Sequence, residues 1–348
     1  MLMKSDTAQS TTPLVWVMQT ARAGDSAQAR ALAEELGWPY ELKTLRFNKF
    51  FNVPNRLLGA TLVSLTQEAR QTLTPPWPDL VIGVARRTVP AARWVKAQSG
   101  GRAKLVQIGR PRLDPSFFDL VISTPQYGLP ARPNVLDLPV PVHPRTALSP
   151  TEASHWADRF SALPRPWTAL ILGGAPWPFR FDEDAMNALA AQVNALTGGI
   201  GSCLICSSPR TVPGAADKVA AKLNGATFAS NWSKEAPNPY RALLASSDRL
   251  VICGDSASML GEACATGKPV YIYSLPSRPF SDATASLGTA LSHTGLINPP
   301  RNMRAMHRRL LDQGHALCLN TPAADTTNAL PNQVSAASRR IAALFAAG

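Results

Sequence analysis

Short apolar runs alternate along the chain with longer, alanine-rich stretches of helical composition. The apolar runs are Leu14–Met18, Asp79–Val84, Lys104–Ile108, Phe118–Ser123, Thr168–Leu172, Cys203–Cys206, Leu250–Cys253 and Val270–Tyr273. Runs of this length without polar alternation are typical of strands that are buried on both faces, as in a parallel sheet. Strands that alternate with helices in this way predict an α/β fold.

The length and a proline-rich segment together predict two domains. The chain has 348 residues, 45% of them hydrophobic, which is enough for two cores of ordinary size. Prolines crowd the segment from Pro139 to Pro166, and such density marks a domain boundary. We expect a disordered tail at residues 1–12, an N-terminal domain at 13–141, a linker at 142–166, a second domain at 167–300 and C-terminal helices at 301–348.

The most informative stretch runs from Asp248 to Tyr273, and its composition predicts a strand, a helix and a second strand. A right-handed crossover points the start of its helix at the carboxyl edge of a parallel sheet, where such folds bind ligands. Free amides and the helix dipole there favour an anion such as a nucleotide diphosphate. Ser258 and Glu262 share one helix face, where a hydroxyl can reach phosphate and a carboxylate can bind ribose hydroxyls. Alternatively, Asp255 or Ser256 caps the helix and Glu262 is solvated.

Two further turns in the second half follow strands and carry residues suited to a ligand. Gly173 and Gly174 form a small-residue turn that lets a ligand or the opposing domain approach the backbone. Ser208, Arg210 and Thr211 offer hydroxyls and a guanidinium to a diphosphate, although hydroxyl-rich turns also cap helices.

In the first half, basic side chains follow two consecutive strands. Arg86 and Arg87 follow the first, and Arg110 and Arg112 follow the second. Both turns lie at the carboxyl edge of a doubly wound sheet, so the four side chains either converge on one anion or diverge as surface charges.

The loop that precedes the first helix contains Gly24 and Asp25. Asp25 caps the helix or faces the ligand cleft as a general base, and the cap is the favoured interpretation. The loop carries one glycine, which does not make a dinucleotide fingerprint, so an NAD enzyme is disfavoured.

A net charge of +12 indicates an anionic partner: nucleic acid, a membrane surface or a phosphorylated substrate. Nucleic acid is disfavoured because the arginines are spread among apolar segments and no known motif occurs. The segment from Phe47 to Leu65 mixes aromatic, basic and aliphatic residues, and it either packs on the sheet, which we favour, or lies on a membrane.

Cysteine and histidine usage predicts neither disulfides nor a metal site. Five scattered cysteines fit a reducing compartment, and Cys203 and Cys206 read as core residues of a strand. The histidines lack metal-ligand spacing, and we expect no required cofactor. No apolar run is long enough to cross a bilayer, so we expect a cytoplasmic protein, with peripheral contact to the inner membrane as the alternative.

These motifs together resemble one family across most of residues 14–318. The residues that carry the resemblance are Gly24, Asp25, Gln28, Arg86, Arg87, Thr88, Ser208, Pro209, Arg210, Thr211, Asn238, Pro239, Tyr240, Asp255, Ser256, Ser258, Met259, Glu262, Ala263, Thr266, Gly267, Lys268, Pro269 and Val270. The set is similar to the mitochondrial fission ELM-like family, whose members look like GT-B glycosyltransferases. Ala85 stands where this family usually has a glycine, and residues 125–127 replace a turn that is often acidic.

The resemblance implies two Rossmann-like domains that face each other across a cleft, with the donor nucleotide in the second domain and the acceptor in the first. Our leading hypothesis is a metal-independent glycosyltransferase that moves a sugar from a nucleotide donor to an anionic, cell-envelope or lipid-linked acceptor. The alternatives are a non-catalytic binding or scaffold protein, as a plant member suggests, or an epimerase or hydrolase of nucleotide sugars.

The hypothesis assigns residues to three roles. The donor side comprises Gly173, Gly174, Ser208, Arg210, Thr211, Asp255, Ser256, Ser258, Met259 and Glu262. The acceptor side comprises Gly24, Gln28, Arg86, Arg87 and Arg110, and Asp25 is the candidate base.

Overall fold

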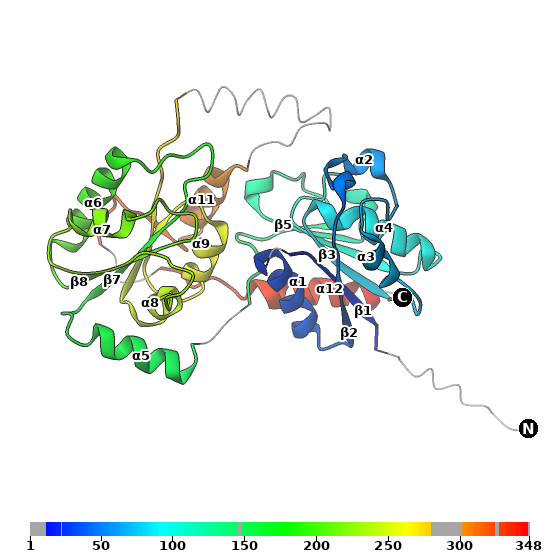
Figure 1. Ribbon diagram of the computed structural model, residues 1–348, viewed down its shortest axis with the longest axis horizontal. Coiled ribbons are helices and arrows are strands. Elements are labelled where there is room, and N and C mark those ends of the chain that lie inside the picture. The colour runs from blue at the N-terminus through cyan, green and yellow to red at the C-terminus, as the bar shows by residue number, and fades with distance from the viewer. Residues whose placement is uncertain (1–11, 22, 145–147, 280–300, 324–326, 347–348) are drawn as a thin grey trace, which may run out of the picture. The chain divides into compact units, whose positions relative to one another are not determined.

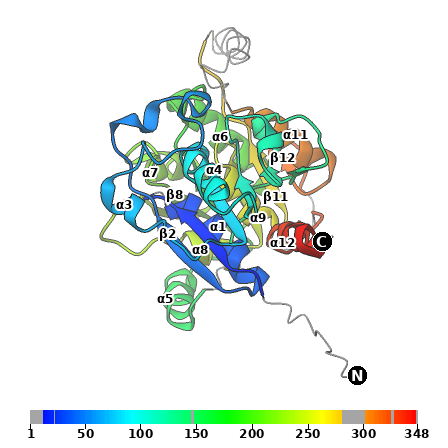
Figure 2. The same ribbon diagram turned by 90° about the vertical axis from the view of Figure 1, so that its right-hand side faces the viewer.

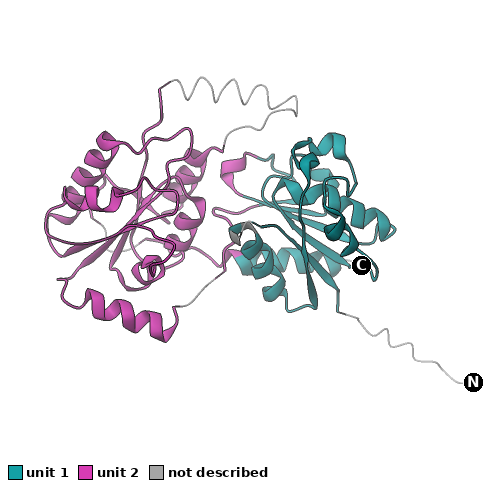
Figure 3. Ribbon diagram, viewed as in Figure 1, with its two compact units in different colours: residues 1–123, 129–136, 334–348 teal, residues 124–128, 137–333 magenta. Residues whose placement is uncertain are grey.

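The computed structural model describes residues 12–21, 23–144, 148–279, 301–323 and 327–346. It divides into two compact units, and residues 1–123, 129–136 and 334–348 form unit 1, whereas residues 124–128 and 137–333 form unit 2 (Figure 3). The disordered tail expected at residues 1–12 lies almost entirely outside the described residues.

Unit 1 is built on a six-stranded sheet with the order β2-β1-β3-β4-β5-β6 in the described chain. Its strands are β1 (Val15–Gln19), β2 (Tyr40–Thr44), β3 (Leu80–Val84), β4 (Lys104–Ile108), β5 (Leu120–Ser123) and β6 (Val135–Asp137). Its helices are α1 (Ala23–Leu36), η1 (Lys49–Asn52), α2 (Asn55–Leu58), α3 (Gln67–Gln71), η2 (Arg86–Thr88), α4 (Val89–Gln98), η3 (Pro115–Phe117) and α12 (Gln333–Ala346). The strand order reverses between β1 and β3, and α1 and α4 cover opposite faces of the sheet (Figures 1 and 2).

Unit 2 contains a second six-stranded sheet, in the order β12-β11-β10-β7-β8-β9 in the described chain. Its strands are β7 (Trp167–Leu172), β8 (Ser202–Ser207), β9 (Ala226–Ser230), β10 (Arg249–Cys253), β11 (Val270–Tyr273) and β12 (Leu317–Cys318). Its helices are η4 (Pro125–Tyr127), α5 (Pro150–Phe160), α6 (Glu183–Thr197), α7 (Ala215–Ala220), α8 (Tyr240–Ser246), α9 (Ala257–Cys264) and α11 (Met303–Asp312). Here the order reverses between β7 and β10.

The central strands of both sheets are apolar, and helices cover them on both faces. β1, β3, β7 and β10 are parallel to their neighbours, and their apolar residues are buried. The α/β fold with two Rossmann-like units is therefore confirmed, and its parallel topology explains the uninterrupted apolar runs. Cys203 and Cys206 are buried and free, and burial raises the pKa of Cys206 to about 12, as expected for core thiols.

The segment expected to be a linker contains the helix α5, which is part of the core of unit 2. Ser149 and Glu152 form a capping box at the start of α5. Trp156 and Phe160 are buried on the other side of the helix, and Phe160 contacts the rings of Trp167 and Phe228. Proline density therefore marks the ends of this helix and not a free linker through residues 142–166.

The C-terminal helices do not form a separate segment at residues 301–348. α11 belongs to unit 2, whereas α12 belongs to unit 1. The rings of Trp38 and Phe345 lie 5.1 Å apart, and Ser335 donates a hydrogen bond to Glu35, so α12 lies against the end of α1.

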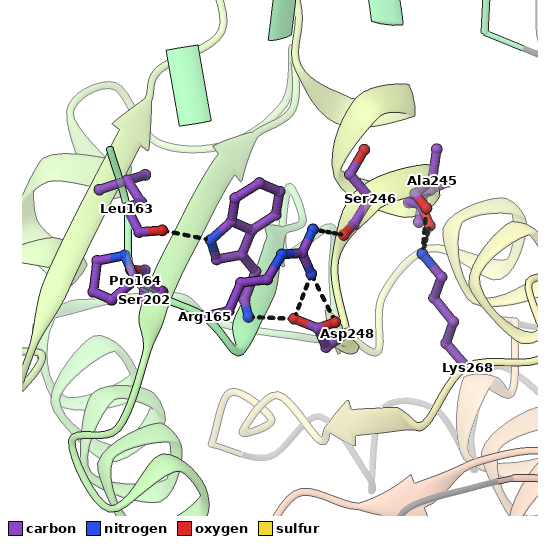
Figure 4. A network of polar contacts seen from close by, with 10 residues as sticks. Leu163, Pro164, Arg165, Ser202, Ala245, Ser246, Asp248 and Lys268 are labelled. Atoms are coloured by element: carbon purple, nitrogen blue, oxygen red, sulfur yellow. Dashed lines mark hydrogen bonds and ion pairs between the residues drawn. The ribbon is translucent and has the colours of Figure 1, made fainter. Parts of the chain in front are cut away.

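A polar network holds the amino ends of the unit 2 strands, at the edge opposite to the expected ligand site (Figure 4). Asp248 accepts hydrogen bonds from Arg165 Nη1 at 2.8 Å and from the Trp167 backbone amide at 2.6 Å. The Arg165 guanidinium lies 3.8 Å from the Trp167 ring centroid, and Lys268 Nζ donates to the Leu244 carbonyl at 2.9 Å. This network joins β7, β10 and β11 where they begin, so it stabilises the sheet.

Candidate functional site

The strand order of unit 2 reverses between β7 and β10, and the loops that follow these two strands contain four of the expected donor residues, Gly173, Gly174, Asp255 and Ser256. In open α/β sheets, ligands bind at such a reversal, beyond the carboxyl ends of the strands. Gly173 and Gly174 follow β7, and residues 254–256 follow β10. The topology thus brings together sites that are about 80 residues apart in the sequence.

The two glycines are required by close contacts within the chain. A Cβ on Gly173 would lie 1.6 Å from Asp255 Oδ1, and one on Gly174 would lie 2.3 Å from the Cβ of Arg210. A larger residue at either position would displace these neighbours. The residues that approach the glycine backbone are therefore Asp255 and Arg210 of the same unit.

Asp255 clamps the glycine turn to the start of α9. Its Oδ2 accepts hydrogen bonds from the backbone amides of Gly174 at 2.9 Å and Ala175 at 3.1 Å. Burial raises the pKa of this carboxyl, while the Gly174 amide and the charge of Arg210 oppose that shift. Ser256, and not Asp255, caps α9, because Ser256 Oγ accepts from the Met259 amide at 3.5 Å.

The hydroxyl groups of the turn after β8 form hydrogen bonds within unit 2. Thr211 Oγ1 donates to the Leu172 carbonyl at 3.0 Å, so the Ser208 hydroxyl donates to Thr211 Oγ1 at 2.9 Å. These bonds fasten the turn to the end of β7. Arg210 is exposed and forms no ion pair with a described carboxylate, so its guanidinium is the group in this turn that can meet a ligand.

Glu262 is held in place on α9 and is not simply solvated. Its Oε2 accepts a hydrogen bond from the Tyr240 hydroxyl at 2.9 Å. Burial raises the pKa of Glu262, while the Tyr240 bond and the nearby His143 lower it. Ser258 lies one helical turn before Glu262 and is exposed. The pair therefore offers a hydroxyl and an oriented carboxylate on one face of the helix.

A cavity of about 280 Å³ lies at the carboxyl end of β11, and no sequence motif predicts it. Its walls are formed by Phe179, Ser274, Leu275, Arg304, His307, Arg308 and Leu311. His307 is buried and its Nε2 donates to the Gly254 carbonyl at 2.6 Å, so this ring separates the cavity from the loop before α9. The two arginines give the cavity a positive charge.

His143 is another residue that sequence reasoning did not select. The segment that contains it crosses α9, because a Cβ on Gly261 would lie 3.1 Å from the Val140 side chain and 3.4 Å from His143 Nδ1. The spacing between His143 and Glu262 carries no motif, and their proximity arises only from the fold.

The acceptor-side residues lie in unit 1, at the carboxyl edge of its sheet. Asp25 is the third residue of α1, which begins at Ala23. Gly24 and Gln28 lie on the same helix, and a Cβ on Gly24 would meet no atom within 4 Å. Arg86 and Arg87 lie in η2, and Arg110 follows the neighbouring strand β4. The assignment of Asp25 as a base stays a prediction.

Within the described residues, no group of three or more histidine, cysteine, aspartate or glutamate side chains is placed to hold a metal ion. Over the same residues, no helix is long and apolar enough to span a bilayer.

Two units in one chain, each with a parallel sheet covered by helices on both faces, are the architecture of the GT-B fold. The sequence model of the family Mitochondrial fission ELM1 matches residues 23–337, and the chain belongs to this family. The expected family and fold are both confirmed.

Relatives extend the comparison to plants and bacteria. The chain is 29% identical to "Mitochondrial fission protein ELM1" of Arabidopsis thaliana in an alignment 243 residues long, and the match covers 62% of this chain and 56% of that protein. It therefore spans little more than half of the plant relative's length. It is 26% identical over 298 residues to "Uncharacterized protein RP120" of Rickettsia prowazekii, covering 76% of this chain and 84% of the relative.

Among solved structures, UDP-GlcNAc 2-epimerase from Neisseria meningitidis, bound to UDP-GlcNAc, has a TM-score of 0.50 with this chain. The match covers 96% of this chain and 100% of the other, at 12% identity, so the two proteins share a fold.

Proposed function

We propose that the protein is a glycosyltransferase that uses a nucleotide sugar as its donor and a cell-envelope or lipid-linked molecule as its acceptor. The observation that carries the proposal is the Glu262 carboxylate of α9, which accepts a hydrogen bond from Tyr240 of α8 and lies one helical turn from the exposed Ser258 at the sheet reversal. A ribose presents two vicinal hydroxyls that a fixed carboxylate can accept. The epimerase that shares this fold is bound to a UDP-sugar, which supports the class of donor.

The reaction exchanges one bond for another at the anomeric carbon of the sugar. The bond from that carbon to the diphosphate breaks, and the acceptor hydroxyl oxygen bonds to the carbon and loses its proton to a base, for which Asp25 is our candidate. The α9 N-terminus and Arg210 stabilise the negative charge of the departing nucleoside diphosphate. The proposed donor site requires no metal ion, because these groups supply the positive charge.

The first experiment is a thermal-shift screen with UDP, GDP, ADP, CMP and dTDP. One of these nucleotides is expected to raise the Tm of the wild type, because a ligand at 100 times its Kd adds about 2.7 kcal/mol to the free energy of unfolding. Glu262→Ala should abolish this shift, and Tyr240→Phe should reduce it. Glu183→Ala, which removes an exposed carboxylate of unit 2, is the matched control and should respond as the wild type does.

If none of the five nucleotides stabilises the wild type, the donor site is not where we place it. A nucleotide that binds while its sugar conjugate is never consumed with any envelope extract would instead support a binding or scaffold role. The name of the plant relative, a mitochondrial fission protein, favours that second candidate. Release of a free, epimerised sugar would identify the third candidate, an epimerase or hydrolase.

A further inference from the structure

Two turns of unit 1 have strained backbones. Three non-glycine residues of the described chain have φ in the left-handed region, and two of them, Ala85 and Arg112, both at 57°, lie in the turns after β3 and β4. The ψ of Ala85 is 174°, a combination that glycine alone adopts without strain. Strain of this kind persists where the surroundings impose it, and it gathers at functional sites.

The surrounding residues impose the conformation of both turns. The Ala85 carbonyl accepts hydrogen bonds from Thr88 Oγ1 at 3.1 Å and Gln107 Nε2 at 2.9 Å. Asn55 is 3% exposed, and its Nδ2 donates to the carbonyls of Arg86 at 2.9 Å and Pro111 at 2.8 Å. One buried amide group therefore fixes the two turns to each other.

The two turns carry four guanidinium groups. Arg86 and Arg87 lie on the first turn, and Arg110 and Arg112 lie on the second. Arg86 Nη2 donates to Asn52 Oδ1 at 3.4 Å, and the Arg87 guanidinium lies 4.3 Å from the Phe51 ring centroid. None of the four forms an ion pair with a carboxylate of the described residues, although arginines elsewhere in unit 1 do, such as Arg132 with Asp114.

The four charges are close enough to act on one another. Partial burial, followed by the charges of Arg86, Arg110 and Arg87, lowers the pKa of Arg112 to about 10. Burial and Arg87 likewise lower the pKa of Arg86. A guanidinium group carries a charge at pH 7, so these four groups repel each other.

We propose that the two turns form a binding site for a phosphate group with at least two negative charges, such as a phosphomonoester or a diphosphate. Guanidinium groups present paired N–H donors that match phosphate oxygens, and several of them can contact one such group. This site adds a feature of the acceptor to the proposed function. It rests on that function in one respect, which is that the phosphate belongs to the acceptor. Binding of the phosphate itself does not depend on glycosyl transfer.

The ligand is either a soluble phosphate or the phosphate of a lipid. The segment beside the turns exposes apolar side chains, with Phe50 43% and Leu57 74% exposed. Such side chains can contact a lipid chain, whereas a soluble sugar phosphate needs the arginines alone. The experiment therefore tests a soluble phosphate and a lipid phosphate separately.

The direct test is calorimetric titration of the full chain with inorganic diphosphate. Arg112→Gln and Arg86→Gln should each weaken binding at least tenfold. The matched control is Arg102→Gln, which removes the same charge from a residue just before β4, at the other edge of the sheet, and should change the affinity less than twofold. The Tm of Arg112→Gln without ligand should equal or exceed that of the wild type, because a like charge is removed.

Failure of the wild type to bind diphosphate would overturn the proposal, and so would an equal loss in Arg102→Gln. Loss of all diphosphate binding in Arg210→Gln would place the ligand in unit 2 and also overturn it. Nucleotide stabilisation of Arg112→Gln should stay at the wild-type level, so failure of this site and failure of the donor site are distinguishable.

Two further binding measurements distinguish a soluble phosphate from a lipid phosphate. One uses glucose 1-phosphate, and the other uses phosphatidylcholine vesicles that contain phosphatidic acid. Binding of glucose 1-phosphate that Arg112→Gln weakens supports a soluble phosphate. Vesicle binding that is lost in Arg112→Gln but kept in Arg102→Gln supports a lipid phosphate. If neither probe binds, the proposal of a phosphomonoester site is overturned.

Discussion

At the scale of single residues, the backbone of Ala85 adopts a conformation that favours glycine. Its φ of 57° and ψ of 174° are costly for alanine, since glycine alone lacks the Cβ that makes this conformation unfavourable. This chain tolerates alanine because Thr88 and Gln107 hold the Ala85 carbonyl in place.

Ala85→Gly should therefore stabilise the protein. Relief of strain contributes about 1–3 kcal/mol, and the greater freedom of glycine in the unfolded chain offsets about 0.5–1 kcal/mol. We expect a net gain of about 1 kcal/mol in the free energy of unfolding, measured by urea denaturation. The matched control is Ala91→Gly inside α4, which should lose about 1 kcal/mol. A destabilised Ala85→Gly variant would contradict the argument.

Gly173→Ala should have the opposite effect. The added methyl group would overlap Asp255 Oδ1 and break the bonds that this carboxylate accepts from residues 174 and 175. We expect a loss of about 1–3 kcal/mol of stability, as for other overpacked sites, together with loss of the nucleotide-induced Tm shift. Gly24→Ala, where the methyl group meets no neighbour, should be tolerated in the same thermal scan.

At the scale of elements, the packing of α11 against the end of β10 requires His307 to stay neutral. His307 donates to the Gly254 carbonyl, and burial lowers its pKa, with the charge of Arg304 acting in the same direction. The unfolded chain therefore takes up a proton near pH 6.5 that the folded chain resists. The stabilising contribution of His307 is complete above this pH and is lost as the pH falls below it.

Substitution of His307 by asparagine should flatten the dependence of stability on pH. For the wild type we expect the free energy of unfolding to fall between pH 7.5 and 5.5, by at most about 1.4 kcal/mol per pH unit from this one group. The difference between the two pH values should shrink in His307→Asn and stay unchanged in His155→Asn, which alters an exposed residue of α5. Equal pH dependence in wild type and His307→Asn would contradict this role.

The sequence predicts the strands whose buried residues form an uninterrupted apolar run. β3, β7 and β10 are buried along their length, so their apolar runs predict them well. β2 is an edge strand with mostly exposed residues, YELKT, and β12 has two residues, so neither leaves an apolar run. Turn residues such as Gly173 and Ser256 were also predictable, because their local conformation requires them. The bonds from Tyr240 to Glu262 and from His307 to Gly254 were not, because they join distant parts of the chain.

At the scale of the whole molecule, the chain leaves unit 1, builds unit 2, and returns to unit 1 with α12. Deletion of residues 333–348 should therefore weaken unit 1 and leave unit 2 intact, since it removes the buried side chains of Ile341 and Ala337. A fully buried isoleucine alone contributes about 1.5–3 kcal/mol. We expect faster hydrogen exchange in β1 and β3 and unchanged exchange in β7 and β10. Deletion of residues 347–348 alone is the control, and an equal effect on both sheets would contradict the division.

The return of α12 also sets the order in which the chain matures on the ribosome. Domains usually fold in the order in which they are synthesised. Here β12 of unit 2 ends at Cys318, whereas unit 1 lacks α12 until residues 333–346 have left the exit tunnel. The unit that begins to be made first is therefore completed after the strands of the other, and a nascent chain that stalls before residue 333 exposes the face of unit 1 that α12 covers.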